Sequence, residues 1–185
     1  MESPLREALE GRLDAAQAAL VAAVAGLSDA EANRAPPSGR WSIAGQVRHL
    51  VRSEKLFLWI FRVNRWRLRL SWRRARPAPP LEEIADRLDF DYGTRKVKAP
   101  FFVRPPRGEQ PPLRDLLASF SRVRAKTKRE LDHLARRDAR GVRFPHPLFG
   151  PLDGYQWMAV AALHVHHHVA AIEEARARGA GTPRR

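Results

Sequence analysis

The stretch LDGYQWMAVAALHVHHHVAAIEE, residues 152–174, contains four of the seven histidines in the chain. A helix start precedes them: Asp153 is placed to cap the first turn, and Gln156, three residues later, is placed to complete a capping box. The register of the helix is therefore set before the first histidine. From Trp157 onward, alternating steps of four and three residues trace the side that a bundle helix turns toward its partners. This side contains Trp157, Ala161, His164, His168, Ala171 and Ala175.

The pair His164 and His168 is a candidate metal site. Residues four apart in a helix lie about 40° apart around its axis, so both imidazoles can face one ion. Burying such a ring without a polar partner costs roughly 1–3 kcal/mol, and a divalent metal would satisfy both rings. His167 is an alternative ligand because it lies three residues from His164, whereas His166 faces roughly the opposite side. The competing interpretation is a histidine run with no metal, satisfied by core contacts or by water.

The composition limits the classes of chemistry. The chain has no cysteine, which excludes disulfides, thiolate metal ligands and a cysteine nucleophile, so any thiol would come from a small molecule. Its formal charge of +14 favours an anionic partner, although only five of the 34 basic residues are lysine and a general preference for arginine explains part of the excess. No apolar run approaches the roughly 18 residues of a membrane span. Acidic residues surround the start of the apolar segment 15–27, unlike a secretory signal, so we expect a cytoplasmic protein.

Four helical segments account for most of residues 1–178, which we expect to form a single all-α domain. Each segment carries apolar residues at helical spacing, and prolines or glycines separate the segments. Ser42 is the expected N-cap of the second helix. The expected helices are residues 4–27, residues 43 to about 70, a segment that starts after Pro112 and ends before Gly141, and a segment from 154 to about 176.

A long connection, residues 77–112, separates the second and third helices. It is rich in proline and is expected to contain a short amphipathic helix at 81–88. A connection of this length can cross the end of a bundle, so the two helices that it joins need not be antiparallel. Long structured connections often cover sites, and Phe101 and Phe102 are candidates to line a pocket mouth or simply to pack. The basic residues 179–185 are expected to form a disordered tail.

The end of the second helix is strongly basic. Residues 62–76 contain seven arginines and no acidic residue, interleaved with Trp66 and Trp72. Arginine and aromatic side chains together suit phosphates and bases, which suggests a nucleic-acid or anionic-ligand surface. No helix-turn-helix, zinc-finger or RNA-recognition pattern accompanies the charge, so the favoured alternative is a solvated, salt-bridged helix end. The candidate surface residues are Arg62, Arg65, Arg69 and Arg73.

His49 is a candidate third ligand because it lies near the start of the second helix, at the border of its apolar stripe. Glu54 lies five residues further on, about 140° around the axis, so one helix cannot easily present both side chains to one ion. His133 lies off the apolar stripe of its helix and is expected to be exposed. His146 lies between two prolines, in the expected turn before the fourth helix, and is expected to be structural.

Three segments in this order resemble the DinB-like superfamily, which also includes YfiT-type metal proteins. They are WSIAGQVRHL (41–50), HPLFGPL (146–152) with the nearby Trp157, and the histidine run 164–168. The resemblance implies a four-helix bundle with up-down-down-up connectivity. It also implies a metal-ligand triad of His49, His164 and His168. The long basic connection between the second and third helices departs from the family pattern.

The implied site has three neutral imidazoles and no protein anion, which leaves coordination positions open, as in catalytic metal sites. Nitrogen ligands suit several divalent transition metals, and we expect zinc or nickel. Relatives in the superfamily include S-transferases and isomerases that use a low-molecular-weight thiol, as well as proposed hydrolases. The resemblance therefore implies a metal-dependent transferase or hydrolase that activates a water or a thiol cosubstrate and acts on an unidentified small molecule, and it is compatible with a homodimer. A nucleic-acid-binding module and a bundle with a purely structural metal are the alternatives.

Overall fold

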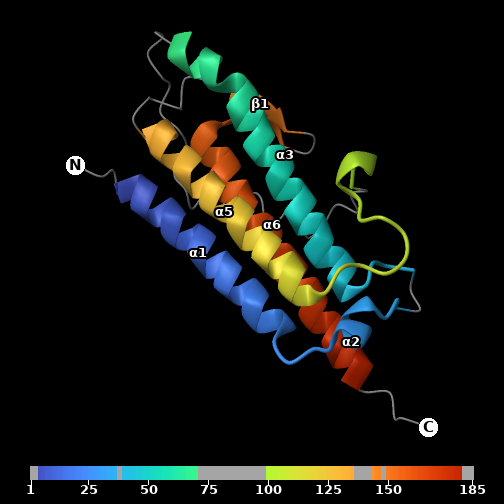
Figure 1. The fold of residues 1–185 in the computed structure, drawn as a ribbon. Coiled ribbons are helices and arrows are strands. Elements are labelled where there is room, and N and C mark those ends of the chain that lie inside the picture. The colour runs from blue at the N-terminus through green and yellow to red at the C-terminus, as the bar shows by residue number, and fades with distance from the viewer. Residues whose placement is uncertain (1–3, 37–38, 71–98, 136–142, 147–148, 181–185) are drawn as a thin grey trace.

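The computed structural model describes residues 4–36, 39–70, 99–135, 143–146 and 149–180. In this part of the chain four long helices form a bundle (Figure 1). They are α1 (Pro4–Val24), α3 (Ile43–Leu70), α5 (Leu113–Ala135) and α6 (Gly154–Ala180). Helix α1 packs against α5 and α6, and α3 packs against the same two helices. The colours in Figure 1 show that α1 and α6 run in one direction, and that α3 and α5 run in the other.

The apolar stripes of the sequence form the core of this bundle. The stripe on α1 contains no polar side chain, and its middle residues are fully buried. Burying one leucine or phenylalanine side chain contributes about 2 kcal/mol to the free energy of folding. Because its buried side is entirely apolar, α1 contributes to stability and offers no polar group to a site. Helix α3 buries one continuous side in the same core, where it packs against α5 and α6. The buried apolar residues of these two helices include Leu9, Leu13, Ala16 and Leu20 on α1, and Ile43, Val47, Leu50, Phe57 and Phe61 on α3.

Side-chain caps fix the register of the two helices that carry the candidate ligands. The Gly45 amide donates to Ser42 Oγ at 3.1 Å at the start of α3. At the start of α6 the Gln156 amide donates to Asp153 Oδ1 at 2.8 Å, and the Asp153 amide donates to Gln156 Oε1 at 2.9 Å. Both expected caps are confirmed. Each satisfies amides that the first helical turn would otherwise leave without a partner.

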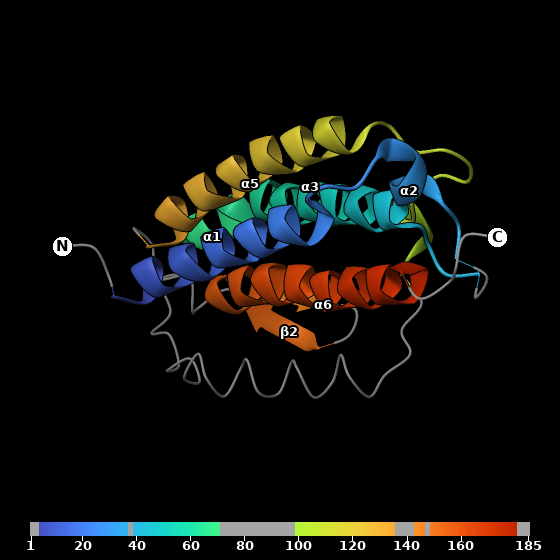
Figure 2. The ribbon, with the colours of Figure 1, turned by 90° about the horizontal axis from the view of Figure 1, so that it is seen from below.

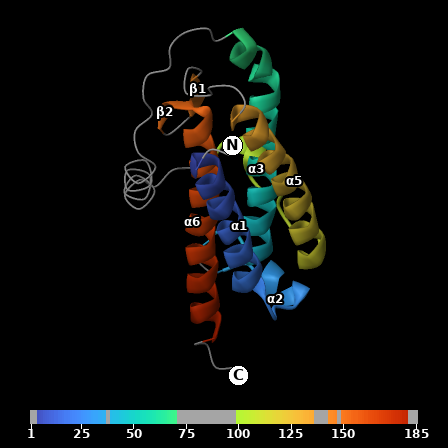
Figure 3. The ribbon, with the colours of Figure 1, turned by 90° about the vertical axis from the view of Figure 1, so that its left-hand side faces the viewer.

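A two-stranded antiparallel hairpin precedes α6, where the sequence had indicated only a turn. Strand β1 (Arg143–His146) pairs with β2 (Gly150–Asp153). His146 therefore lies on a strand. Trp157 Nε1 donates to the Phe144 carbonyl at 3.2 Å, which ties the hairpin to the first turn of α6. Figure 2 shows β2 beside α6, and Figure 3 shows the hairpin at the end of the bundle where α6 begins, opposite the end that holds the short helix α2 (Asp29–Asn33).

Several boundaries differ from the expected ones. Helix α1 ends at Val24, three residues earlier than expected, and the short helix α2 forms in the connection between the first two expected helices. Ser28 and Glu31 form a capping box that explains this short helix. Helix α6 continues to Ala180, two residues into the expected tail. The expected helix at 81–88 and the remaining tail residues lie outside the described part of the chain.

The end of the connection between α3 and α5 folds back onto the first half of α3. Because these two helices run in the same direction, the chain must return along the bundle before α5 begins. The short 3-10 helix η1 (Phe101–Val103) lies on this returning segment, and Arg52 donates to the Phe102 carbonyl at 2.7 Å. This contact brings η1 beside the helical turn that carries His49. Among the described helices, none combines the length and apolar character that a bilayer crossing requires.

Candidate metal centre

Three histidines meet inside the bundle, between α3 and α6. His49 comes from α3, and His164 and His168 come from successive turns of α6. The potential ligand atoms of these three side chains lie within 4.8 Å of one another. Their ring centroids are 4.9–5.1 Å apart, with His49 and His168 buried and His164 half-buried. The structure thus brings together the three residues that the resemblance implied, and all three rings border one small volume.

The ring of His49 is fixed by the returning segment. His49 Nδ1 lies 2.9 Å from the Val103 carbonyl, which can only accept, so Nδ1 carries the proton and Nε2 keeps its lone pair. The Trp41 ring packs against the imidazole with centroids 4.8 Å apart. Ser53 Oγ lies 3.4 Å from Nε2. The lone pair of His49 is therefore directed into the cluster.

His168 is held in the same tautomer by a side chain. Its Nδ1 donates to Gln46 Oε1 over 3.2 Å, which leaves the lone pair on Nε2. Metal-binding histidines commonly donate their other ring nitrogen to a carbonyl or carboxylate in this way. The sequence offered one clue to Gln46, which precedes His49 by three residues on the same side of α3. It offered none to Val103, which acts through its backbone from 54 residues away.

The spacing of the nitrogen atoms fits a metal ion. His49 Nε2 and His164 Nε2 are 3.2 Å apart. Two nitrogen ligands, each 2.0–2.1 Å from a tetrahedral ion, would lie about 3.3 Å apart. Without an ion, His164 must donate a proton across this gap to avoid placing two lone pairs against each other. The cluster found among the described residues contains imidazoles only, the donor type that suits zinc, nickel, copper and iron(II).

The protonation state of the cluster also suits metal binding. Burial lowers the pKa of His49, His164 and His168, and nearby positive charges lower each pKa further. Arg52 acts in this way on His49, and Arg40 on His168. The three rings are therefore neutral at pH 7, the form in which imidazole binds a metal.

The other histidines lie outside the cluster. His166 and His167 are exposed on α6, so the structure does not bring His167 into the cluster as an alternative ligand. His133 is half-buried, not exposed as expected. His146 is buried and packs between Phe149 and Trp157, with ring centroids 4.7 Å from each, which agrees with the structural role expected for it.

The predicted basic surface at the end of the second helix is described only in part. Arg62 is exposed, and its Nε lies 3.8 Å from Glu130 Oε1. Arg65 and Arg69 lie on the described backbone of α3, and Arg73 lies outside the described residues. The geometry of this surface beyond Arg62 therefore stays a prediction.

A buried ion pair lies beside the cluster and was missed in the sequence. Arg124 on α5 and Glu54 on α3 are 1% and 2% exposed, and Arg124 Nε lies 3.0 Å from Glu54 Oε1. A second guanidinium nitrogen donates to Glu54 Oε2 at 3.2 Å. Glu54 is therefore paired with Arg124, and Asp132 on α5 is paired with Arg6. Neither carboxylate belongs to the cluster.

Acid is expected to destabilise the protein through His146. Burial lowers its pKa from 6.5 to about 4, so the unfolded chain takes up this proton more readily. Stability is therefore lost as the pH falls from 6.5 toward 4, by about 3 kcal/mol for this group. Urea unfolding of metal-free protein at pH 7 and pH 4 measures the loss. His146→Gln keeps an acceptor for the Phe149 amide and should reduce the pH dependence, whereas the exposed His166→Gln should leave it unchanged. Equal pH dependence in all three proteins would refute this assignment.

The fold and the cluster together define a four-helix bundle protein with a candidate three-histidine metal centre. The sequence profile of the DinB superfamily matches residues 12–172, so the chain belongs to the DinB superfamily. The resemblance found in the sequence is thereby confirmed.

The fold is similar to that of a solved structure. The crystal structure of TT2238, a four-helix bundle protein, matches with a TM-score of 0.55 and 22% sequence identity, covering 91% of this chain and 98% of the TT2238 chain. At this identity the similarity supports the fold alone. No curated protein matches the chain.

Proposed function

We propose that the protein is a metal-dependent enzyme of the transferase or hydrolase type, with one divalent transition metal, zinc or nickel, held by His49, His164 and His168. The observation that carries the proposal is the convergence of three neutral imidazoles, two of which are fixed in the tautomer that keeps the lone pair on Nε2. When bound, such an ion acts as a Lewis acid and lowers the pKa of a water or a thiol.

The surrounding residues favour an external reactant. Three neutral ligands leave one coordination position of a tetrahedral ion open, and they do not neutralise the 2+ charge of the ion. Because the chain has no cysteine, a thiol at this position would belong to a small-molecule cosubstrate. His164 is the least buried of the three ligands, so we expect the small molecule to approach on its side. A homodimer and a cytoplasmic location stay predictions.

Metal analysis tests the site directly. We expect about one equivalent of transition metal in untagged protein after reconstitution with zinc or nickel, and none in His164→Ala, because two ligands bind far more weakly than three. His167→Ala is the matched control, since it removes an exposed histidine of the same helix and should retain the metal. Parent protein that stays metal-free after reconstitution would overturn the proposal.

A second measurement separates a catalytic metal from a structural one. Protein loaded with cobalt(II) should change its visible spectrum when a small thiol such as 2-mercaptoethanol is added, because an open position accepts the sulfur. A spectrum that the thiol leaves unchanged would indicate a closed, structural site. In that case chelation should still lower the melting temperature.

A further inference from the structure

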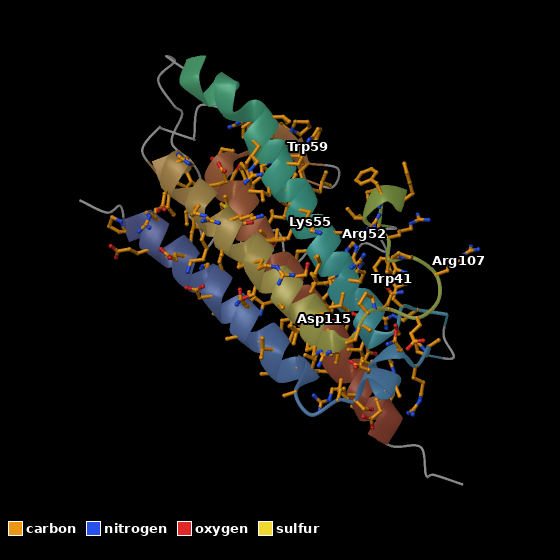
Figure 4. The ribbon with its side chains drawn as sticks, viewed as in Figure 1. Trp41, Arg52, Lys55, Trp59, Arg107 and Asp115 are labelled. Atoms are coloured by element: carbon orange, nitrogen blue, oxygen red, sulfur yellow. The ribbon has the colours of Figure 1, made fainter. Side chains whose placement is uncertain are left out.

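One surface of the bundle carries cations with hardly any acid among them. It consists of the outer side of α3 between residues 48 and 59 and the returning segment, residues 99–107. The single acidic residue in these two ranges is Glu54, which is buried and paired with Arg124. Figure 4 shows Arg52, Lys55 and Trp59 following one another along α3, with Arg107 on the neighbouring segment. Apart from Pro106, the exposed residues in these two ranges are positive or aromatic.

Aromatic side chains project from the same surface. Trp59 is 59% exposed, Phe101 80% and Phe102 47%. The two phenylalanines meet edge to face with centroids 5.3 Å apart, and the bond from Arg52 to the Phe102 carbonyl fixes η1 beside α3. Three solvent-exposed aromatic rings on one surface indicate that this surface contacts a partner. We call this surface the aromatic-basic face; it comprises Arg48, Arg52, Lys55, Trp59, Phe101, Phe102 and Arg107.

The described part of the protein does not neutralise the positive charge of this face. Arg48 and Arg52, one turn apart on α3, have buried Nε atoms without a hydrogen-bond partner. Neither guanidinium forms an ion pair with a described carboxylate. Half-buried cations without counter-charges are costly, and the cost falls when an anion binds them. The partner of the aromatic-basic face is therefore expected to be anionic.

We propose that the aromatic-basic face binds single-stranded nucleic acid. Arginine and lysine bind phosphates, and exposed rings stack on unpaired bases whatever their sequence. Duplex DNA hides the faces of its bases, so the exposed rings favour a single strand. The aromatic rings project from the surface, whereas Arg48 and Arg52 are half-buried. A flexible single strand can contact both levels of this uneven surface more easily than a flat anionic bilayer can. The proposal does not depend on the metal centre.

Binding of the full chain to a fluorescently labelled 20-nucleotide oligothymidylate, followed by anisotropy, tests the proposal. We expect an affinity that falls steeply with salt and falls at least tenfold in Trp59→Ala/Phe101→Ala, because two stacking contacts are lost. Val21→Ala, which trims an exposed apolar side chain on α1, is the matched control and should bind like the parent. Circular dichroism should show every variant folded, since the altered side chains are exposed.

The charges are tested in the same assay. Lys55→Ala/Arg107→Ala should reduce the slope of log affinity against log salt by about 1.4, at about 0.7 for each lost phosphate contact. Lys126→Ala/Arg129→Ala removes two exposed cations of α5 and should keep the parent slope. No binding at low salt, or binding that is insensitive to the aromatic variants, would overturn the proposal. So would tighter binding to a duplex or to vesicles containing phosphatidylserine.

Discussion

Arg124→Met is expected to lower the free energy of unfolding by about 3–5 kcal/mol, because it leaves the Glu54 carboxylate buried without its partner. The loss should depend on pH. Burial already raises the pKa of Glu54, and Arg124 partly offsets that rise. Without the arginine the folded pKa lies further above the unfolded value of 4.5, so stability is lost as the pH rises through it. Urea unfolding at pH 5 and pH 8 should show the larger deficit at pH 8.

The double variant Glu54→Leu/Arg124→Met separates the ion pair from the packing of its two side chains. Replacing both charges with apolar groups of similar size should restore most of the stability that Arg124→Met loses, because no unpaired charge is left. Its stability should also no longer depend on Glu54 titration. A double variant as unstable as Arg124→Met at both pH values would show that the deficit comes from lost packing, for example of Arg124 against the Phe120 ring.

The sequence does contain a pattern that is consistent with this buried ion pair. Glu54 stands at an inward position of α3, between Leu50 and Phe57 in steps of four and three. Arg124 stands likewise on α5, four residues after Phe120. A single charge within an apolar stripe is readily assigned to the helix surface. Two such charges on helices that are adjacent in the bundle can satisfy each other, but only the packing shows that they meet.

Local patterns were sufficient to predict two of the three clustered histidines. Asp153 and Gln156 fix the register of α6, and that register alone turns His164 and His168 inward. His49 was less certain from its own helix because it stands at the border of the apolar stripe. The prediction that His49 belongs to the triad depended on the family resemblance. The pattern of a single helix does not determine how α3 is rotated about its axis relative to α6.

Two parts of the site could not be predicted for physical reasons. The Val103 carbonyl orients His49 through the backbone, so its own side chain gives no signal. The hairpin before α6 has strands of four residues with Pro145 opposite Pro151, and proline is unfavourable in most strands. A two-stranded ribbon tolerates both prolines because, within the part of the chain that the structure describes, each strand has a free edge. Trp157 then anchors the hairpin from α6.

Removing the metal from reconstituted protein is expected to lower its free energy of unfolding by about 4 kcal/mol when free metal had been present at about a thousand times the dissociation constant. The physical reason is linkage: the cluster exists only in the folded chain, so the binding free energy adds to its stability. For a protein of this size the melting temperature should fall by roughly 8–16 °C. Thermal unfolding with metal and with a chelator measures the change.

The size of this change in variants tests whether the stabilisation comes from the three-histidine cluster. His49→Ala/His164→Ala/His168→Ala should melt at one temperature with or without metal, while His166→Ala should keep the full parental shift because its side chain is exposed on α6. Gln46→Leu is the graded case. It leaves all three ligands in place but removes the acceptor of His168 Nδ1, which should weaken metal affinity about 10–100-fold and so reduce the shift by about 1.4–2.7 kcal/mol. A metal-dependent shift that survives in the triple variant would place the bound ion elsewhere on the chain, because no part of the cluster would be left to hold it.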